Sequence, residues 1–134
     1  MLPSALLSPT IYVVDDDEAV RESMRFLLES HGMTVRDFPD ARAFIDAEKP
    51  LEHLFGRNCC LLLDLHMPGM SGADLLEHMQ AAGHTIPAVV LTGRSSPPMR
   101  ERVERAGALG LLEKPAEEHD LTREISRALA VGAA

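Results

Sequence analysis

The sequence predicts an α/β fold in which helices cover both faces of a parallel sheet. Short apolar segments alternate five times with segments whose apolar residues recur at helical spacing. The apolar segments are continuous rather than interrupted by polar residues, which is typical of parallel strands buried on both faces. The length of 134 residues suits one domain and is too short for a second one of ordinary size.

The first two strand–helix pairs are predicted as follows. Residues 10–14 (TIYVV) form a continuous apolar run that predicts a buried strand. Asp17 is expected to cap the next helix, whose apolar spacing continues to a stop at Gly32. Residues 33–38 predict a weaker strand, and its charged residues suit the edge of a sheet. Asp40 can cap the second helix.

The central part of the chain carries the clearest signals. Residues 59–64 (CCLLLD) predict a buried strand that ends on an acidic residue. Ser71 and Asp74 form a capping pattern for the third helix. Residues 87–92 (PAVVLT) predict the fourth strand, and Pro97 begins a short helix with a thin apolar face.

The two ends of the chain complete the prediction. Residues 109–112 predict the fifth strand, and the apolar spacing after it predicts a last helix that frays from residue 131. Residues 1–9 are expected to form a loose leader, because two prolines interrupt regular structure there. We therefore expect the domain to occupy residues 10–131, with no output domain in this chain.

Composition and charge argue against several classes of protein. The 21 acidic residues outnumber the 13 basic ones, which argues against binding to nucleic acid or to anionic membranes through this domain. No apolar run approaches the roughly 20 residues of a membrane span, and the N-terminus lacks the early basic residue of a signal peptide. Cys59 and Cys60 are adjacent and are expected to be buried thiols rather than a disulfide. We expect a cytoplasmic protein.

Residues with complementary chemistry follow the predicted strands: Asp15, Asp16, Asp64, Thr92 and Lys114. The carboxyl ends of parallel strands meet at one rim of a sheet, which is where ligands bind in open α/β folds. Clustered carboxylates suit Mg²⁺, and a carboxylate can also accept a phosphoryl group. Each residue alone is more often a helix cap or a surface residue, so the prediction depends on the combination.

Four segments that contain these residues resemble the receiver domain of two-component response regulators: 13–17 (VVDDD), 61–72 (LLLDLHMPGMSG), 89–93 (VVLTG) and 107–115 (GALGLLEKP). Their order and spacing fit over about residues 10–130. DLHMPGMSG, together with LTG and EKP, resembles the subgroup that often carries a C-terminal helix-turn-helix. The resemblance implies a doubly wound (βα)5 flavodoxin-like sandwich with a five-stranded parallel sheet in the order 2-1-3-4-5.

The resemblance also implies roles for the acidic residues. Asp64 matches the phosphoacceptor. Asp16 matches the direct ligand of Mg²⁺ (or Mn²⁺), and Asp15 matches its neighbour, which often acts through water. The backbone carbonyl of His66 matches the third protein ligand of the metal.

On the same basis, Thr92 matches the switch hydroxyl and Lys114 matches the phosphate-binding lysine. The Lys114–Pro115 peptide bond is expected to be cis, and Gly93 matches a small residue that leaves room for the phosphoryl group. The family usually has Tyr or Phe in the fifth strand as its other switch residue, whereas this chain has Leu111. We therefore hypothesise altered switching.

Two further residues are candidates for controlling the lifetime of the phosphoryl group. His66 and Arg94 each lie two positions beyond a site residue, and the resemblance implies that side chains at these positions affect the lifetime by shaping the access of water. A bulky arginine beside the phosphoryl group could pair with it and shield it from water. The alternative, that both side chains simply face solvent, stays open.

The function implied is a phosphorylation-activated signalling switch. A sensor histidine kinase or a phosphotransfer protein would donate the phosphoryl group. The chain would catalyse only its own phosphorylation and dephosphorylation. The output would be a homodimer or an effector complex formed through the fourth helix, fifth strand and fifth helix, although a merely solvated surface there is an open alternative.

Two other classes of function are alternatives to the switch. A haloacid-dehalogenase-type phosphatase also uses an aspartate after a central strand, but it needs a second acid two residues later, where this chain has His66. A scaffold that keeps the fold without phosphorylation is disfavoured by the complete set of site residues. Binding of beryllofluoride with Mg²⁺ distinguishes the switch from the scaffold.

Overall fold

Five parallel strands form one sheet in the computed structural model, which describes residues 8–54, 57–83 and 86–133. The strands lie in the order β2-β1-β3-β4-β5, so the order implied by the resemblance is confirmed. Their bounds are β1 (Thr10–Val14), β2 (Thr34–Phe38), β3 (Cys59–Asp64), β4 (Ala88–Thr92) and β5 (Gly110–Glu113). Most of the expected leader, residues 1–7, lies outside the described residues.

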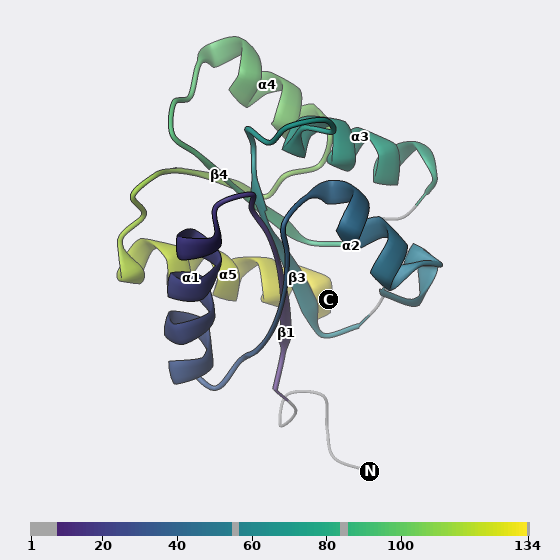
Figure 1. The fold of residues 1–134 in the computed structure, drawn as a ribbon. Helices are drawn as coiled ribbons and strands as arrows, with labels where there is room; N and C mark the ends of the chain where they lie inside the picture. Colours follow the sequence, from purple (N-terminus) through teal and green to yellow (C-terminus); the bar gives the residue numbers. More distant parts are fainter. Residues whose placement is uncertain (1–7, 55–56, 84–85, 134) are drawn as a thin grey trace.

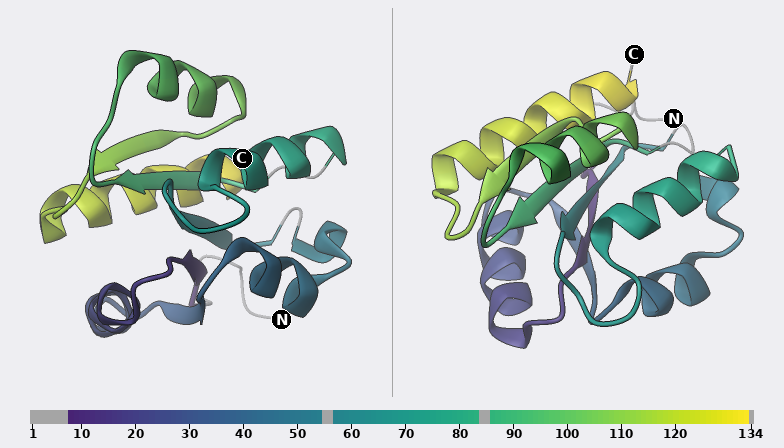
Figure 2. Two further views of the ribbon diagram at one scale, coloured as in Figure 1. Left: turned by 45° about the horizontal axis from the view of Figure 1, so that its top comes forward. Right: turned by 90° about the horizontal axis from the view of Figure 1, so that it is seen from above.

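Helices cover both faces of the sheet, as Figures 1 and 2 show. Helices α1 and α5 pack on one face, and α2, α3 and α4 pack on the other. Their bounds are α1 (Glu18–Ser30), α2 (Ala41–Glu48), α3 (Gly72–Ala81), α4 (Pro97–Arg105) and α5 (Glu118–Ala133). A short 3-10 helix, Leu51–Leu54, follows α2 and was not expected from the sequence.

The two adjacent cysteines show how the core is divided. Cys59 packs into the cluster beneath α2, α3 and α4, and Cys60 packs into the cluster beneath α1 and α5. Neighbouring residues of a strand point to opposite faces, so each thiol fills a different core. Burial raises the pKa of Cys60 to about 12, which keeps this thiol protonated and unreactive. The prediction of buried free thiols is confirmed.

Local capping rules account for the starts of the helices. The Asp17 side chain accepts hydrogen bonds from the first turn of α1, and Asp40 accepts one from the first turn of α2. Ser71 and Asp74 form a reciprocal capping box at α3. These predictions are confirmed, as is the edge position of β2.

The end of α5 differs from the prediction. The sequence VGAA is expected to fray, but the helix continues to Ala133. Gly132 packs closely on Pro87. A Cβ atom added to Gly132 would lie only 2.8 Å from the proline ring, so there is no room for a side chain between them. This close packing against the residue before β4 explains why the last turn stays helical. Among the described residues, no helix is long and apolar enough to span a membrane.

Candidate functional site

Three aspartates meet at the carboxyl-terminal rim of the sheet. Asp15 and Asp16 follow β1, and Asp64 is the last residue of β3. One carboxylate oxygen of each lies within 4.8 Å of the others. Asp15 and Asp64 are buried, whereas Asp16 is exposed. A set of hard oxygen ligands that is open to solvent on one side fits Mg²⁺, which keeps several of its waters and takes one or two carboxylates.

Lys114 joins this cluster from the loop after β5. Its Nζ atom lies 2.9 Å from Asp15 Oδ2 and 3.2 Å from Asp64 Oδ1. Its backbone amide donates a hydrogen bond to the Thr92 carbonyl at 2.7 Å. The Lys114–Pro115 peptide bond is cis, as expected. The ammonium group therefore stands between two buried carboxylates of the rim.

The pKa of Asp64 is set by its burial and by the neighbouring charges of Asp15 and Lys114. Burial raises the pKa of Asp64 to about 6, and the charge of Asp15 acts in the same direction, whereas Lys114 opposes both. Burial also acts to lower the pKa of Lys114, but its contacts with Asp15 and Asp64 outweigh burial and the pKa is raised. The lysine stays charged, and an added cation would further favour the ionised carboxylates.

Asp15 is held by its backbone as well as by its side chain. Its amide donates to the Phe38 carbonyl at 3.1 Å, and its carbonyl accepts a hydrogen bond of 2.8 Å from Arg21. Its Oδ1 atom accepts a hydrogen bond of 2.9 Å from the Asp17 amide, while Oδ2 faces Lys114. Four hydrogen bonds thus hold Asp15 in place.

Thr92 lies at the end of β4 and is fully buried. Its hydroxyl donates a hydrogen bond to the Arg94 carbonyl at 2.8 Å and accepts one from the Arg94 amide at 3.1 Å. The hydroxyl hydrogen is therefore used within the loop between β4 and α4, and it must leave the Arg94 carbonyl before it can bind another acceptor.

Gly72 brings the start of α3 against the backbone of the acidic strand. A Cβ atom at this position would lie 2.5 Å from the Asp64 carbonyl oxygen and 3.0 Å from Leu65 Cα. The Gly72 amide also donates a hydrogen bond to the Leu65 carbonyl at 3.0 Å. Only a residue without a side chain allows α3 to begin so close to Asp64.

The family model described as the response regulator receiver domain matches residues 11–126. The chain belongs to this family. The acidic cluster, Thr92 and Lys114 all fall within the matched part of the receiver domain.

Named relatives are similar over most of this receiver domain. The transcriptional regulatory protein FixJ of Bradyrhizobium diazoefficiens is 42% identical over 119 residues, which make up 89% of this chain and 56% of that protein. The response regulator protein TmoT of Ectopseudomonas mendocina is 38% identical over 120 residues, covering 89% of this chain and 52% of that protein. The chain thus spans about half the length of these relatives.

A solved structure supports the same assignment. That of FixJ-N has a TM-score of 0.81 and 37% sequence identity, and the match covers 93% of this chain and 96% of that chain. The relatives named above are regulators of transcription or response regulators, in keeping with the subgroup that the sequence resembles.

The residues predicted to control the phosphoryl lifetime lie in the loops that follow β3 and β4. His66 is exposed, and its amide lies 3.4 Å from Asp64 Oδ1. Arg94 is exposed and contacts Thr92 through its backbone. A side chain at Gly93 would meet nothing within 4 Å, so the space beside it is open.

Leu111 occupies β5 at the position expected for a switch residue. It pairs with Val90 in the sheet and packs partly buried against the core beneath α4. It also lines a hollow of about 240 Å³ between α4, β5 and α5, together with Arg100, Glu104 and Arg127. The expected output surface therefore has a groove with charges of both signs.

Sequence reasoning did not single out Arg21 or Asp37 as site residues. The signal that could have suggested them is a pair of arginines four residues apart in α1, Arg21 and Arg25, opposite an acidic residue in an edge strand. The pairing depends on how α1 packs on β2, which no local pattern specifies.

Proposed function

We propose that this receiver domain is a phosphorylation-activated switch that accepts a phosphoryl group on Asp64. The observation that carries the proposal is the convergence of Asp15, Asp16, Asp64 and Lys114 at one rim. The donor is a histidine kinase or a phosphotransfer protein. The Asp64 oxygen forms the new bond to phosphorus as the bond from phosphorus to the donor nitrogen breaks.

Asp15, Asp16, Asp64 and the backbone carbonyl of His66 would hold Mg²⁺ (or Mn²⁺). When bound, the metal neutralises negative charge on the carboxylates and on the phosphoryl oxygens. Burial raises the pKa of Asp64 to about 6, and a bound cation would favour its ionised, nucleophilic form. Lys114 Nζ, already 3.2 Å from Asp64 Oδ1, pairs with the transferred group.

The switch begins at Thr92 in this proposal. Its hydroxyl turns from the Arg94 carbonyl to a phosphoryl oxygen, which is a stronger acceptor because it is charged. The loop between β4 and α4 then loses one internal hydrogen bond. Ser95 in this loop donates a hydrogen bond of 2.5 Å to Glu113 of β5, so the change reaches the strand that carries Leu111.

The output surface is the face formed by α4, β5 and α5. Its hollow is lined by charged residues of both helices, Arg100 and Glu104 of α4 and Glu124 and Arg127 of α5. A face with charges of both signs can pair with a second copy of itself through a two-fold axis. We propose a homodimer or an effector complex through this face. The net charge of −8 argues against contact with nucleic acid through this domain. The two free, buried cysteines accord with a cytoplasmic site of action.

Beryllofluoride, which mimics the phosphoryl group, tests the proposal together with Mg²⁺. The wild-type domain is expected to bind it, Asp64→Asn to lose binding, and the exposed control Asp46→Asn to keep it, as measured by calorimetry. Binding that survives in Asp64→Asn would refute the assignment of the acceptor. No binding by the wild-type domain would instead favour the scaffold.

A further inference from the structure

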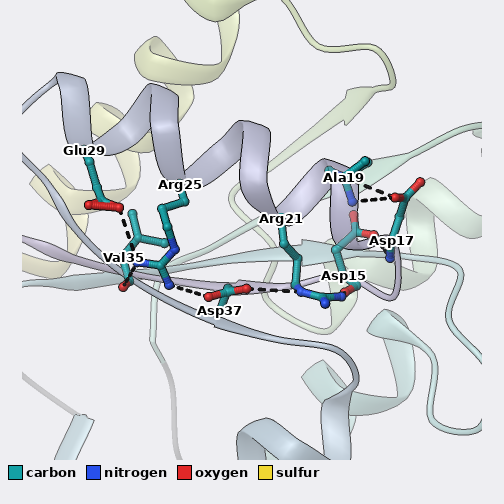
Figure 3. A network of polar contacts seen from close by, with 9 residues as sticks. Asp15, Asp17, Ala19, Arg21, Arg25, Glu29, Val35 and Asp37 are labelled. Carbon is teal, nitrogen blue, oxygen red and sulfur yellow. Dashed lines mark hydrogen bonds and ion pairs between the residues drawn. The ribbon is translucent and has the colours of Figure 1, made fainter.

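The side chain of Arg21 bridges the loop after β1 and the edge strand β2 (Figure 3). Its Nη1 atom donates a hydrogen bond of 2.8 Å to the Asp15 carbonyl, and its Nε atom lies 3.1 Å from Asp37 Oδ2. Only 15% of the side chain is exposed. One guanidinium group thus ties the backbone of the acidic cluster to a neighbouring strand.

Asp37 is held from its other side by Arg25, one turn further along α1 (Figure 3). Arg25 also donates a hydrogen bond of 3.1 Å to the Val35 carbonyl of the same strand. The hydrogen bond from Arg25 keeps the pKa of Asp37 below its ordinary value although burial acts to raise it. Asp37 therefore stays ionised and provides a fixed anchor for Arg21.

The hydrogen bond to the Asp15 carbonyl has a direct consequence for Asp16. A peptide unit is planar, so the direction of the Asp15 carbonyl also sets the positions of the Asp16 amide and Cα. Asp15 has its own further contacts through Phe38, Asp17 and Lys114. Asp16 is the exposed member of the cluster. The orientation of this peptide unit therefore helps to set where the Asp16 carboxylate lies beside Asp64.

We propose that Arg21, anchored by Asp37, is a positioning residue that orients Asp16 toward a bound divalent cation. The inference rests on the proposed function, because it takes the three-aspartate cluster as the metal site. Arg21 does not touch the metal. It acts on the affinity for the metal by holding one ligand in place before binding, as residues outside the coordination sphere do in other metal sites.

Arg25 provides a matched control, because it contacts the same aspartate without contacting the Asp15 carbonyl. Affinity for Mg²⁺ alone is measured by calorimetry on the whole chain, and unfolding in urea is measured in parallel. Arg21→Gln is expected to weaken Mg²⁺ binding about tenfold, the lower end of the effect of such residues. Arg25→Gln leaves both hydrogen bonds of Arg21 in place, so it is expected to lose stability but to weaken Mg²⁺ binding less than Arg21→Gln does.

Asp37→Asn tests whether Asp37 holds Arg21 in place. It also replaces Arg21→Gln as the test variant if Arg21→Gln does not fold. It is expected to weaken Mg²⁺ binding less than Arg21→Gln, and the double variant is expected to bind as Arg21→Gln does, because Asp37 acts only through Arg21. Wild-type affinity in Arg21→Gln or Asp37→Asn would overturn the inference, as would an equal loss in Arg25→Gln. Failure of the wild-type domain to bind Mg²⁺ would overturn the proposed metal site as well.

Discussion

Thr92 and Arg94 form a closed pair of hydrogen bonds between the Thr92 hydroxyl and the Arg94 backbone, at 2.8 and 3.1 Å. The pair ties the end of β4 to the loop that leads to α4. It also uses the one hydrogen that the hydroxyl can donate. A new acceptor at Asp64 must therefore compete with the loop, which makes this pair a direct test of the proposed switch.

Thr92→Val removes the hydroxyl and keeps the shape of the buried side chain. We expect the free energy of unfolding to fall by about 1 kcal/mol, the net contribution of a typical hydrogen bond. Amide shifts caused by beryllofluoride should persist near Asp64 and shrink in α4. The control is Thr122→Val on α5, whose hydroxyl donates to the Glu118 and His119 carbonyls of its own helix. Undiminished shifts in α4 would show that the signal does not pass through Thr92.

Arg94→Ala tests control of the phosphoryl lifetime. The side chain is exposed beside the loop at Thr92, where it could pair with a phosphoryl group and shield it from water. Loss of one such hydrogen bond should shorten the lifetime of phosphorylated Asp64 by a factor of roughly 2 to 10. Decay of radiolabelled protein measures this, with the exposed Arg42→Ala as control. An unchanged or longer lifetime would contradict the prediction.

Gly72→Ala tests the close approach of α3 to the acidic strand. The added Cβ would lie 2.5 Å from the Asp64 carbonyl oxygen, so the backbone must shift. We expect a loss of about 1–3 kcal/mol in the free energy of unfolding, the usual cost of overpacking. Gly93→Ala, where a Cβ meets no atom within 4 Å, is the control for stability. Equal stability of the two variants would rule out the clash.

The ion pairs of Asp37 predict a dependence of stability on pH. The hydrogen bond from Arg25 holds the pKa of this carboxyl below its ordinary value in the folded state. The folded state therefore binds fewer protons than the unfolded chain, whose aspartates have a pKa of about 3.9. The stabilisation is complete above that pKa and is lost as the pH falls through the lower folded value.

Unfolding in urea across a series of pH values measures this effect. The difference in free energy between the wild-type domain and Asp37→Asn should be constant above about pH 5 and should shrink below about pH 4. Asp46→Asn, which removes an exposed partner 3.8 Å from Lys49, should cause a smaller difference. A difference for Asp37→Asn that grows as the pH falls would contradict the sign of the shift.

Leu111 tests the hypothesis of altered switching. A leucine in β5 has no ring to rotate, so beryllofluoride should shift the amides of the loop between β4 and α4 more than those of β5. Leu111→Phe restores a ring and should enlarge the shifts in β5. If the wild-type domain already shows shifts in β5 and α4 like those of aromatic-switch receivers, the hypothesis is wrong.

The strands and helix starts could be predicted because their signals are local. Continuous apolar residues identify the buried strands, and Asp17, Asp40 and Ser71 cap helices within three residues of themselves. The end of α5 could not be predicted in this way, because it depends on the contact of Gly132 with Pro87, 45 positions earlier in the chain.

The fold class and the grouping of the rim residues could be read from the amino-acid pattern, because parallel strands place their carboxyl ends together and β1, β3, β4 and β5 each end at or beside a predicted site residue. How those residues are held depends on the packing of the folded chain. The turn of Thr92 toward Arg94 and the reach of Arg21 to both Asp15 and Asp37 depend on side-chain directions and helix packing. The contacts of Arg21 join separate elements of the fold, and neither they nor the Thr92 contact leaves a periodic pattern in the sequence.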